Sequence, residues 1–212
     1  MRKWFRLLAG MVFLLGVGAG RSAARAADKP IYEKLKDVRP LKKGDLAPGG
    51  KLLTIDGKEI DLKTLISQKP TILIFYRGGW CPYCSRQLQE LAELEPSFEE
   101  MGFQILAISP DMPHRLEVSL KRDELNYTLL SDQTLELTRR FGLVYRLDNM
   151  SRSIFAVEKA TGNSLHLLPV PAAFVLDTQG VIRFVYYNPD FTVRVNTEDL
   201  MTAAKGVTEG KH

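Results

Sequence analysis

Cysteine and histidine are scarce in this chain of 212 residues, which contains two of the former and three of the latter. So few cysteines exclude a small secreted protein held together by many disulfides. The histidines are His114, His166 and the terminal His212, and no second Cys-x-x-Cys or His-x-x-x-His segment accompanies them. A tetrahedral zinc site needs such a ligand set, so we expect no metal.

The sequence also lacks a glycine-rich phosphate loop at the start of a helix and a cluster of potential cofactor ligands. It therefore predicts no nucleotide, flavin or haem cofactor. Apolar residues are plentiful, since 45% of the chain is hydrophobic and 25% is charged. That balance allows a sizeable core, and it excludes a disordered or collagen-like chain.

Charge is absent from residues 7–20, a run of fourteen residues that follows three cations near the N-terminus. Ala24-Arg25-Ala26 then supplies small residues two positions apart. This order predicts a secretory signal peptide over residues 1–26. The alternative is an uncleaved membrane anchor, but fourteen helical residues span roughly 21 Å, whereas a bilayer core is about 30 Å thick.

The net charge of +4 would suit a nucleic-acid partner if the excess cations lay on the folded domain. Residues 1–26 contain five cations and no acid, so their removal leaves 24 basic against 25 acidic residues. We therefore expect no nucleic-acid partner, and a membrane contact only through an uncleaved signal. The expected location is the periplasm or the cell exterior. The alternative is a protein anchored in the inner membrane, with its folded domain facing the periplasm.

The mature chain predicts one α/β domain over residues 51–207, preceded by a leader segment over 27–50 and followed by a tail over 208–212. The predicted strands are 71–76, 103–109 and 127–130. The predicted helices are 82–101, 115–125, 134–141 and 197–205. Hairpins are expected over 51–62, with a type I′ turn at Asp56-Gly57, and over 172–187. No element is assigned to residues 144–168. Strands that alternate with helices indicate a central sheet flanked by helices.

Both cysteines fall in Trp80-Cys81-Pro82-Tyr83-Cys84, where a predicted buried strand gives way to a helix. At the start of a helix, free amides and the helix dipole favour an exposed thiolate at Cys81. Cys84 lies one turn further on, within reach to form a disulfide with Cys81. Such a pair combines an attacking and a resolving thiol. We expect the pKa of Cys81 to lie between about 5 and 7.5 and Cys81 to be alkylated before Cys84.

Two alternatives to a redox role remain for this pair. An inert structural disulfide is one, although a bridge that closes so short a loop stabilises the fold little. A zinc site is the other, and it lacks the remaining ligands.

The segment 75–84, Phe-Tyr-Arg-Gly-Gly-Trp-Cys-Pro-Tyr-Cys, resembles the active-site strand and turn of the thioredoxin-fold superfamily. The surrounding chain resembles its peroxiredoxin-like (AhpC/TSA, redoxin) branch over roughly residues 44 to 205. Shorter similarities lie at Gly44-Asp45-Leu46-Ala47-Pro48, Ile108-Ser109-Pro110-Asp111, Leu130-Ser131-Asp132, Phe141-Gly142-Leu143 and the segment 170–177.

This resemblance implies a thioredoxin-like fold with a mixed sheet and a redox disulfide between Cys81 and Cys84. It also implies that Pro171 forms a cis peptide bond facing the cysteines, and that Val170 and Pro171 bind substrate through exposed backbone. Trp80, next to the thiol, is a candidate contact surface for a partner.

Several positions depart from the family pattern. Typical peroxiredoxins place a proline and a threonine or serine where this chain has Ile74 and Gly78, and an arginine near the position of Pro171. Thioredoxins often carry an acid at the position of Phe75. The nearest cations, Arg77 and Arg86, are candidates to lower the pKa of Cys81, and Arg77 is the better placed.

The main functional hypothesis is an exported thiol-disulfide oxidoreductase, a peroxiredoxin-like antioxidant protein that uses a dithiol. The alternatives are a thiol-dependent hydroperoxide reductase and a redox-inert, partner-binding domain of the same fold. In either enzyme, a protein disulfide or a hydroperoxide is the substrate, and electrons come from an unidentified thiol reductant.

Overall fold

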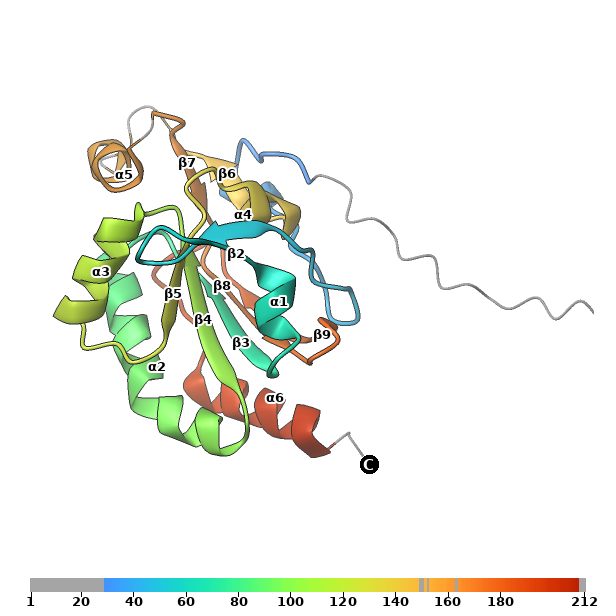
Figure 1. Ribbon diagram of the computed structural model, residues 1–212. Helices are drawn as coiled ribbons and strands as arrows, with labels where there is room; N and C mark the ends of the chain where they lie inside the picture. The colour runs from blue at the N-terminus through green and yellow to red at the C-terminus, as the bar shows by residue number, and fades with distance from the viewer. Residues whose placement is uncertain (1–28, 149–150, 152, 163, 210–212) are drawn as a thin grey trace, which may run out of the picture.

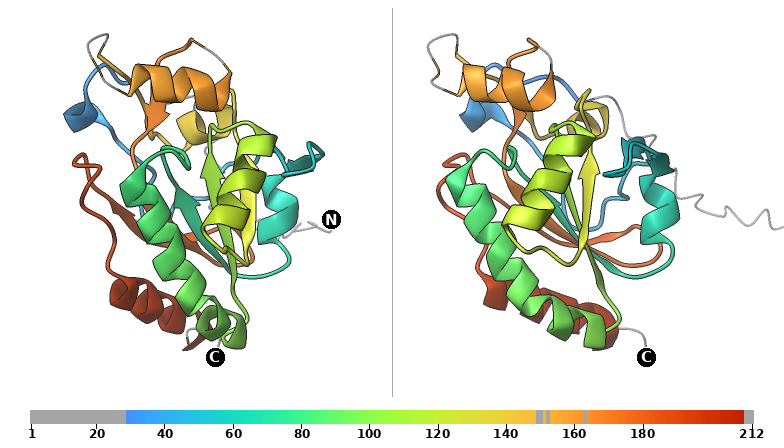
Figure 2. Two further views of the ribbon diagram at one scale, coloured as in Figure 1. Left: turned by 90° about the vertical axis from the view of Figure 1, so that its left-hand side faces the viewer. Right: turned by 60° about the vertical axis from the view of Figure 1, so that its left-hand side comes forward.

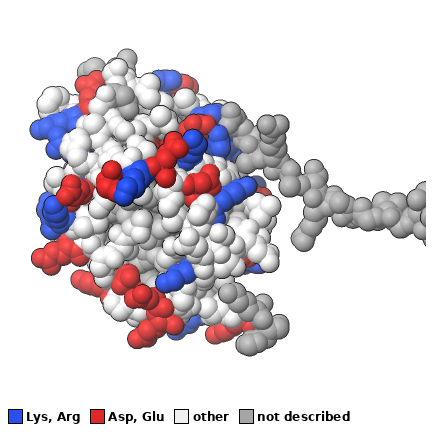
Figure 3. Space-filling model, in the orientation of Figure 1, with Lys and Arg blue, Asp and Glu red and all other residues white. Residues whose placement is uncertain are grey.

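The computed structural model describes residues 29–148, 151, 153–162 and 164–209. The predicted signal peptide lies outside this range. Among the described residues, no helix combines the length and apolar character that crossing a membrane requires. On the face drawn in Figure 3, acidic and basic side chains are interspersed.

A seven-stranded mixed sheet forms the centre of the fold, in the order β2-β1-β5-β4-β3-β8-β9 (Figure 1). Its strands are β1 (Lys51–Leu53), β2 (Glu59–Asp61), β3 (Thr71–Phe75), β4 (Gln104–Ser109), β5 (Thr128–Ser131), β8 (Ala172–Leu176) and β9 (Ile182–Tyr187). Strands β3, β4 and β5 run parallel, whereas β8 pairs antiparallel with β3. The predicted thioredoxin-like sheet is confirmed.

Strand β3 is buried on both faces because helices cover each side of the sheet. Ile72 and Ile74 belong to the apolar core beneath α2 (Pro82–Glu100), α3 (Pro113–Arg122) and α6 (Thr197–Glu209). Leu73 and Phe75 point to the opposite core, beneath α1 (Leu62–Ile66) and α4 (Glu136–Arg140). Figure 2 shows α2, α3 and α6 together on one side. Successive side chains of β3 therefore point alternately into the two cores, one on each face of the sheet.

The sequence pattern predicts no element for residues 144–168. The described part of this range contains β6 (Val144–Arg146), α5 (Ile154–Thr161) and the start of β7 (Leu167–Pro169). Strands β6 and β7 pair in a separate two-stranded sheet. All three elements are short, and neither strand alternates clearly between polar and apolar residues.

The leader segment is more firmly built into the domain than predicted. A 3₁₀ turn covers Leu35–Asp37, and Leu41 and Ala47 are buried in the core beneath α1 and α4. The backbone of Tyr32 pairs with that of Tyr145. Residues 29–50 therefore contribute to the fold of the domain.

Three local predictions were wrong. In the first hairpin, only Gly57 of the Asp56-Gly57 pair has positive φ, at 77°, and Gly57 N–H bonds to the Thr54 carbonyl. A type I′ turn needs two residues with positive φ, so this five-residue connection is of another type. Leu62 begins helix α1, which the prediction missed, and α6 continues to Glu209, into the predicted tail.

Candidate active site

The two cysteines lie at the first turn of α2, where the chain leaves β3. Cys81 is the N-cap residue and Pro82 occupies the first turn, where a missing N–H costs nothing. The amides of Cys84 and Ser85 donate to the Cys81 carbonyl at 2.9 and 3.1 Å. Both thiols are free and buried, with exposed fractions of 2% for Cys81 and 0% for Cys84. The expected exposure of Cys81 was wrong, because Cys81 belongs to the core cluster formed by residues of β3, α2 and α6.

The environment favours a thiolate at Cys81. The Cys84 thiol, the Cys84 amide and the guanidinium groups of Arg77 and Arg194 lower the pKa of Cys81 to about 5, although burial opposes them. Burial, followed by the influence of Cys81, raises the pKa of Cys84 well above its usual value. The first thiol therefore carries the negative charge in the reduced pair.

Arg77 is held beside the reactive sulfur by one hydrogen bond and two aromatic rings. Its Nη1 lies 3.8 Å from Cys81 Sγ, and its Nη2 donates to Ser153 Oγ at 3.0 Å. The guanidinium carbon lies 5.0 Å from the centre of the Trp80 ring and 4.1 Å from that of Phe191. A cation fixed between two aromatic faces keeps its charge directed at the sulfur. In this structure, Trp80 contacts Arg77 and the core.

Arg194, which sequence reasoning missed, reaches the second sulfur. It lies between β9 and α6, and its Nη2 is 3.4 Å from Cys84 Sγ. Its Nη1 is 3.3 Å from Oε1 of Gln87 on α2. No local pattern marks this arginine, because 110 residues separate it from Cys84.

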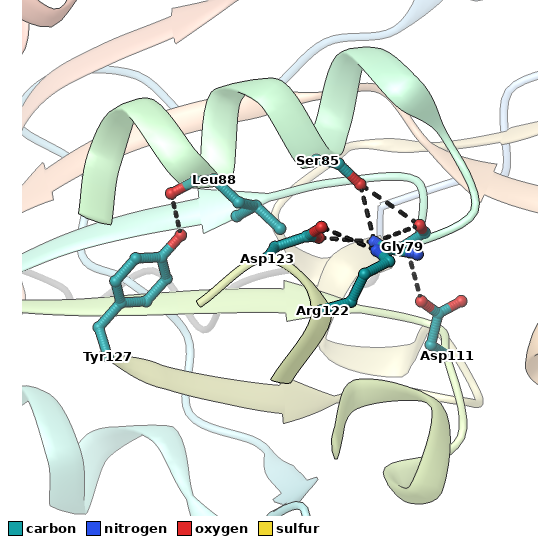
Figure 4. Close-up of polar contacts among 7 residues, drawn as sticks. All are labelled: Gly79, Ser85, Leu88, Asp111, Arg122, Asp123 and Tyr127. Carbon is teal, nitrogen blue, oxygen red and sulfur yellow. Dashed lines mark hydrogen bonds and ion pairs between the residues drawn. The ribbon is translucent and has the colours of Figure 1, made fainter. Parts of the chain in front are cut away.

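A pair of hydrogen bonds fixes the turn before Cys81 (Figure 4). The Gly79 amide donates to Asp111 Oδ2 at 2.7 Å, and Arg122 Nη2 donates to the Gly79 carbonyl at 2.9 Å. Arg122 is itself held by Asp123 at 2.6 Å and Ser85 at 2.9 Å. Burial raises the pKa of Asp111 to about 6. The position of the peptide next to Trp80 is therefore set by groups on the loop between β4 and α3, on α3 and on α2.

The positions that depart from the family pattern have structural consequences. Gly78 has φ 144°, and a Cβ there would lie 2.3 Å from Trp80 Nε1 and 2.6 Å from Asp111 Oδ1. A threonine or serine at this position would collide with both. Ile74 and Phe75 are buried within β3. Arg77 provides a cation beside Cys81.

The prediction for the proline segment was wrong. The peptide bond between Val170 and Pro171 is trans, and both residues are buried. The Val170 amide donates to the Leu143 carbonyl at 2.8 Å, so it is not open to a substrate chain. The small sheet of β6 and β7 extends to this point and supplies that partner. Pro171 directly precedes β8, where a proline is readily accommodated.

Access to Arg77 comes from a groove of about 780 Å³, whose walls include Leu35, Tyr145, Ser153 and Phe191. Arg86 is exposed on α2, and His114 is exposed on α3. His166 Nε2 lies 2.9 Å from Glu158 Oε1. Within the described residues, no three His, Cys, Asp or Glu side chains are grouped so that they could hold a metal ion.

Comparison with known proteins agrees with this geometry. The model of the AhpC/TSA family matches residues 43–185. Peroxiredoxin Bcp of Escherichia coli is 28% identical over 149 residues, covering 70% of this chain and 87% of that protein. Chloroplastic peroxiredoxin Q of Gentiana triflora is 26% identical over 182 residues, covering 85% and 73%. The structure of peroxidoxin BcpB from Mycobacterium tuberculosis superposes with a TM-score of 0.64 at 21% identity, covering 81% of this chain and 99% of that one. The protein therefore belongs to the AhpC/TSA family of thiol-dependent enzymes.

Proposed function

We propose that the protein is a thiol-dependent hydroperoxide reductase in which Cys81 is oxidised and Cys84 resolves the product. The observation that carries this proposal is the Cys81 sulfur, which lies 3.8 Å from Arg77 Nη1 and one helical turn from a second thiol. A thiolate with a low pKa beside a fixed cation is the state that attacks a peroxide oxygen.

The reaction proceeds in two steps. The Cys81 thiolate attacks one oxygen of the hydroperoxide, the O–O bond breaks, and the alkoxide or hydroxide that leaves takes up a proton. Cys81 is then a sulfenic acid. Cys84 attacks its sulfur, a disulfide forms, and water leaves. Two electrons from a thiol reductant return both cysteines to the reduced state.

Two features favour a hydroperoxide over a protein disulfide as substrate. Cys81 is only 2% exposed, and the Val170 amide is already bonded, so neither offers a surface to an extended chain. A hydroperoxide is a small molecule, and Arg77, whose Nη1 lies 3.8 Å from Cys81 Sγ, lines a groove that such a molecule could enter. The relatives named above are also peroxiredoxins, which supports the peroxidase alternative over thiol-disulfide exchange.

An extracytoplasmic location is part of the proposal. It rests on the order of cations, apolar residues and small residues within 1–26. N-terminal sequencing of the protein from its native cell tests this point. A mature chain that begins near Ala27 supports export, and one that begins at Met1 in the cytosolic fraction rejects it.

Single-turnover oxidation tests the function. The reduced protein is mixed with hydrogen peroxide or tert-butyl hydroperoxide, and loss of thiols is followed in time. We expect a rate constant at least about 100-fold above that of free cysteine thiolate, because fixed donors stabilise the developing charge. Cys81→Ser should abolish the reaction, and Cys84→Ser should stop it at a sulfenic acid that dimedone traps. A rate equal to that of free cysteine thiolate would reject the proposal.

A further inference from the structure

The connection between β9 and α6 brings a cation to the resolving sulfur. Arg194 Nη2 lies 3.4 Å from Cys84 Sγ, and Arg194 Nη1 is bonded to Gln87 one turn further along α2. Cys84 is fully buried and Gln87 nearly so. Each sulfur of the pair therefore has an arginine in contact with it, Arg77 at Cys81 and Arg194 at Cys84.

We infer that Arg194 is a catalytic residue for the resolving half of the cycle, where it stabilises the thiolate of Cys84. The same contact serves when reduction of the disulfide releases Cys84 as a thiolate. The inference deepens the proposed function, since it assigns the resolving step, but it applies to any oxidant that first reacts with Cys81.

The need for this cation arises from the order of events. In the reduced protein, the Cys84 thiol stabilises the Cys81 thiolate, so Cys84 keeps its proton. Once Cys81 is oxidised, it no longer carries a charge. Cys84 must then ionise in a buried site, where desolvation opposes a negative charge. The guanidinium at 3.4 Å offsets that cost.

The other titratable and charged groups near Cys84 do not take this role. Arg77 is directed at Cys81 and stacked between two rings. Burial raises the pKa of Tyr76 and Tyr145, so both phenols stay neutral while the cysteines react. Arg194 is the cation in contact with the Cys84 sulfur.

The resolving step balances without a further reactant. Cys84 gives up its proton, and its thiolate attacks the sulfur of the Cys81 sulfenic acid. The S–S bond forms, the S–O bond breaks, and the hydroxide that leaves combines with a proton to give water. When Cys81 instead carries a mixed disulfide, the same attack expels the second half of the oxidant as a thiolate.

A chromogenic disulfide separates the two halves without peroxide. The reduced protein is mixed rapidly with 4,4′-dithiodipyridine, which releases one coloured thione when Cys81 reacts and a second when Cys84 resolves. At pH 8, well above the pKa of Cys81, Cys81 stays ionised in Arg194→Met although Arg194 contributes to lowering that pKa, so we expect the first, concentration-dependent phase to slow by no more than about threefold. Because a contacting charge shifts a pKa by one to three units, the second, first-order phase should slow by about 10- to 100-fold. The pH midpoint of that phase should rise by about 1 to 2 units.

Three further variants make the test specific. Arg194→Lys keeps the charge and should restore most of the rate. Gln87→Met, which frees the guanidinium from its anchor, should slow the second phase less than Arg194→Met and shift its pH midpoint upward. Arg86→Met removes a cation from the exposed face of the same helix and should change neither phase.

The inference is overturned if folded Arg194→Met resolves within threefold of wild type, or if Arg86→Met slows resolution equally. Should Arg194→Met fail to fold, as judged by circular dichroism, Gln87→Met decides, and an unchanged second phase refutes the role. A wild-type protein that resolves the aromatic disulfide but does not react with hydroperoxide rejects the proposed function alone.

Discussion

Replacement of Arg77 by methionine tests how the reactive thiolate is stabilised. Methionine keeps an apolar chain between Trp80 and Phe191 but removes the charge 3.8 Å from Cys81 Sγ. At an effective dielectric constant of about 20, two unit charges at this separation interact by roughly 4 kcal/mol. The guanidinium charge is delocalised, and Arg194 and the Cys84 thiol remain. The observed effect should therefore be smaller.

In Arg77→Met, we expect the pKa of Cys81, which is about 5 in the wild type, to reach a value between about 6 and 7. This rise lies at the low end of the one to three pKa units that a neighbouring opposite charge contributes. At pH 6 the thiolate fraction would then fall from about 90% to between roughly 10% and 50%. The rate of alkylation at pH 6 should fall by about two- to tenfold, because the thiolate is the nucleophile.

The assay is the rate of iodoacetamide labelling against pH, read by mass spectrometry of the peptide that contains the cysteines. Arg77→Lys should shift the midpoint less, since it keeps a charge without the planar fork. Arg86→Met, on the exposed face of α2, is the matched control and should leave the midpoint in place. A shift below about 0.5 units in Arg77→Met would show that Arg77 does not stabilise the thiolate.

Three other predictions follow from the same region. Limited labelling of the reduced protein with iodoacetamide at pH 6 should modify Cys81 before Cys84, because the pKa of Cys81 is lowered and that of Cys84 is raised. If Cys84 is labelled first, the roles of the two cysteines are reversed. Burial raises the pKa of Asp111 from 3.8 to about 6, so the folded state favours the protonated carboxyl group. The free energy of unfolding should therefore fall by roughly 3 kcal/mol as the pH rises from about 4 to above 6. Urea unfolding at pH 4 and pH 7 should show that this loss is reduced in Asp111→Asn, and an equal loss in both proteins would contradict it. Gly78→Ala should lower the free energy of unfolding by at least about 2 kcal/mol, through backbone strain and the collision with Trp80. Gly57→Ala, whose new Cβ meets open space, should lower it by only about 1 to 2 kcal/mol. Equal losses for the two variants in urea unfolding would count against the collision.

The elements with a strong local pattern were predictable from the sequence. The apolar run at β3 and the helical spacing after Pro82 placed both cysteines correctly at a strand-to-helix junction. Helix α1 escaped prediction because its five residues are too few to show a period. The same holds for β6 and β7, which have three residues each.

The environment of the thiols was less predictable, because it depends on contacts between distant segments. The sequence placed Arg77 near Cys81, only four residues away, but it gave no indication of Arg194 or of the burial of Cys81. The cis form expected for Pro171 came from the family resemblance, whereas in this chain Val170 is bonded to Leu143. Local patterns thus identified the reacting groups and the nearby Arg77, but not the distant residues that surround them.

The contact between Cys84 and Arg194 also has a consequence during protein synthesis. The ribosome makes both cysteines before it makes this arginine, which follows Cys84 by 110 residues. At about 5–20 residues per second, that interval lasts roughly 5 to 20 seconds. Throughout it, the thiols of the nascent chain lack the cation that later contacts Cys84, and the loop that carries it has not closed over them. The complete redox centre therefore forms late, when nearly the whole domain has been made.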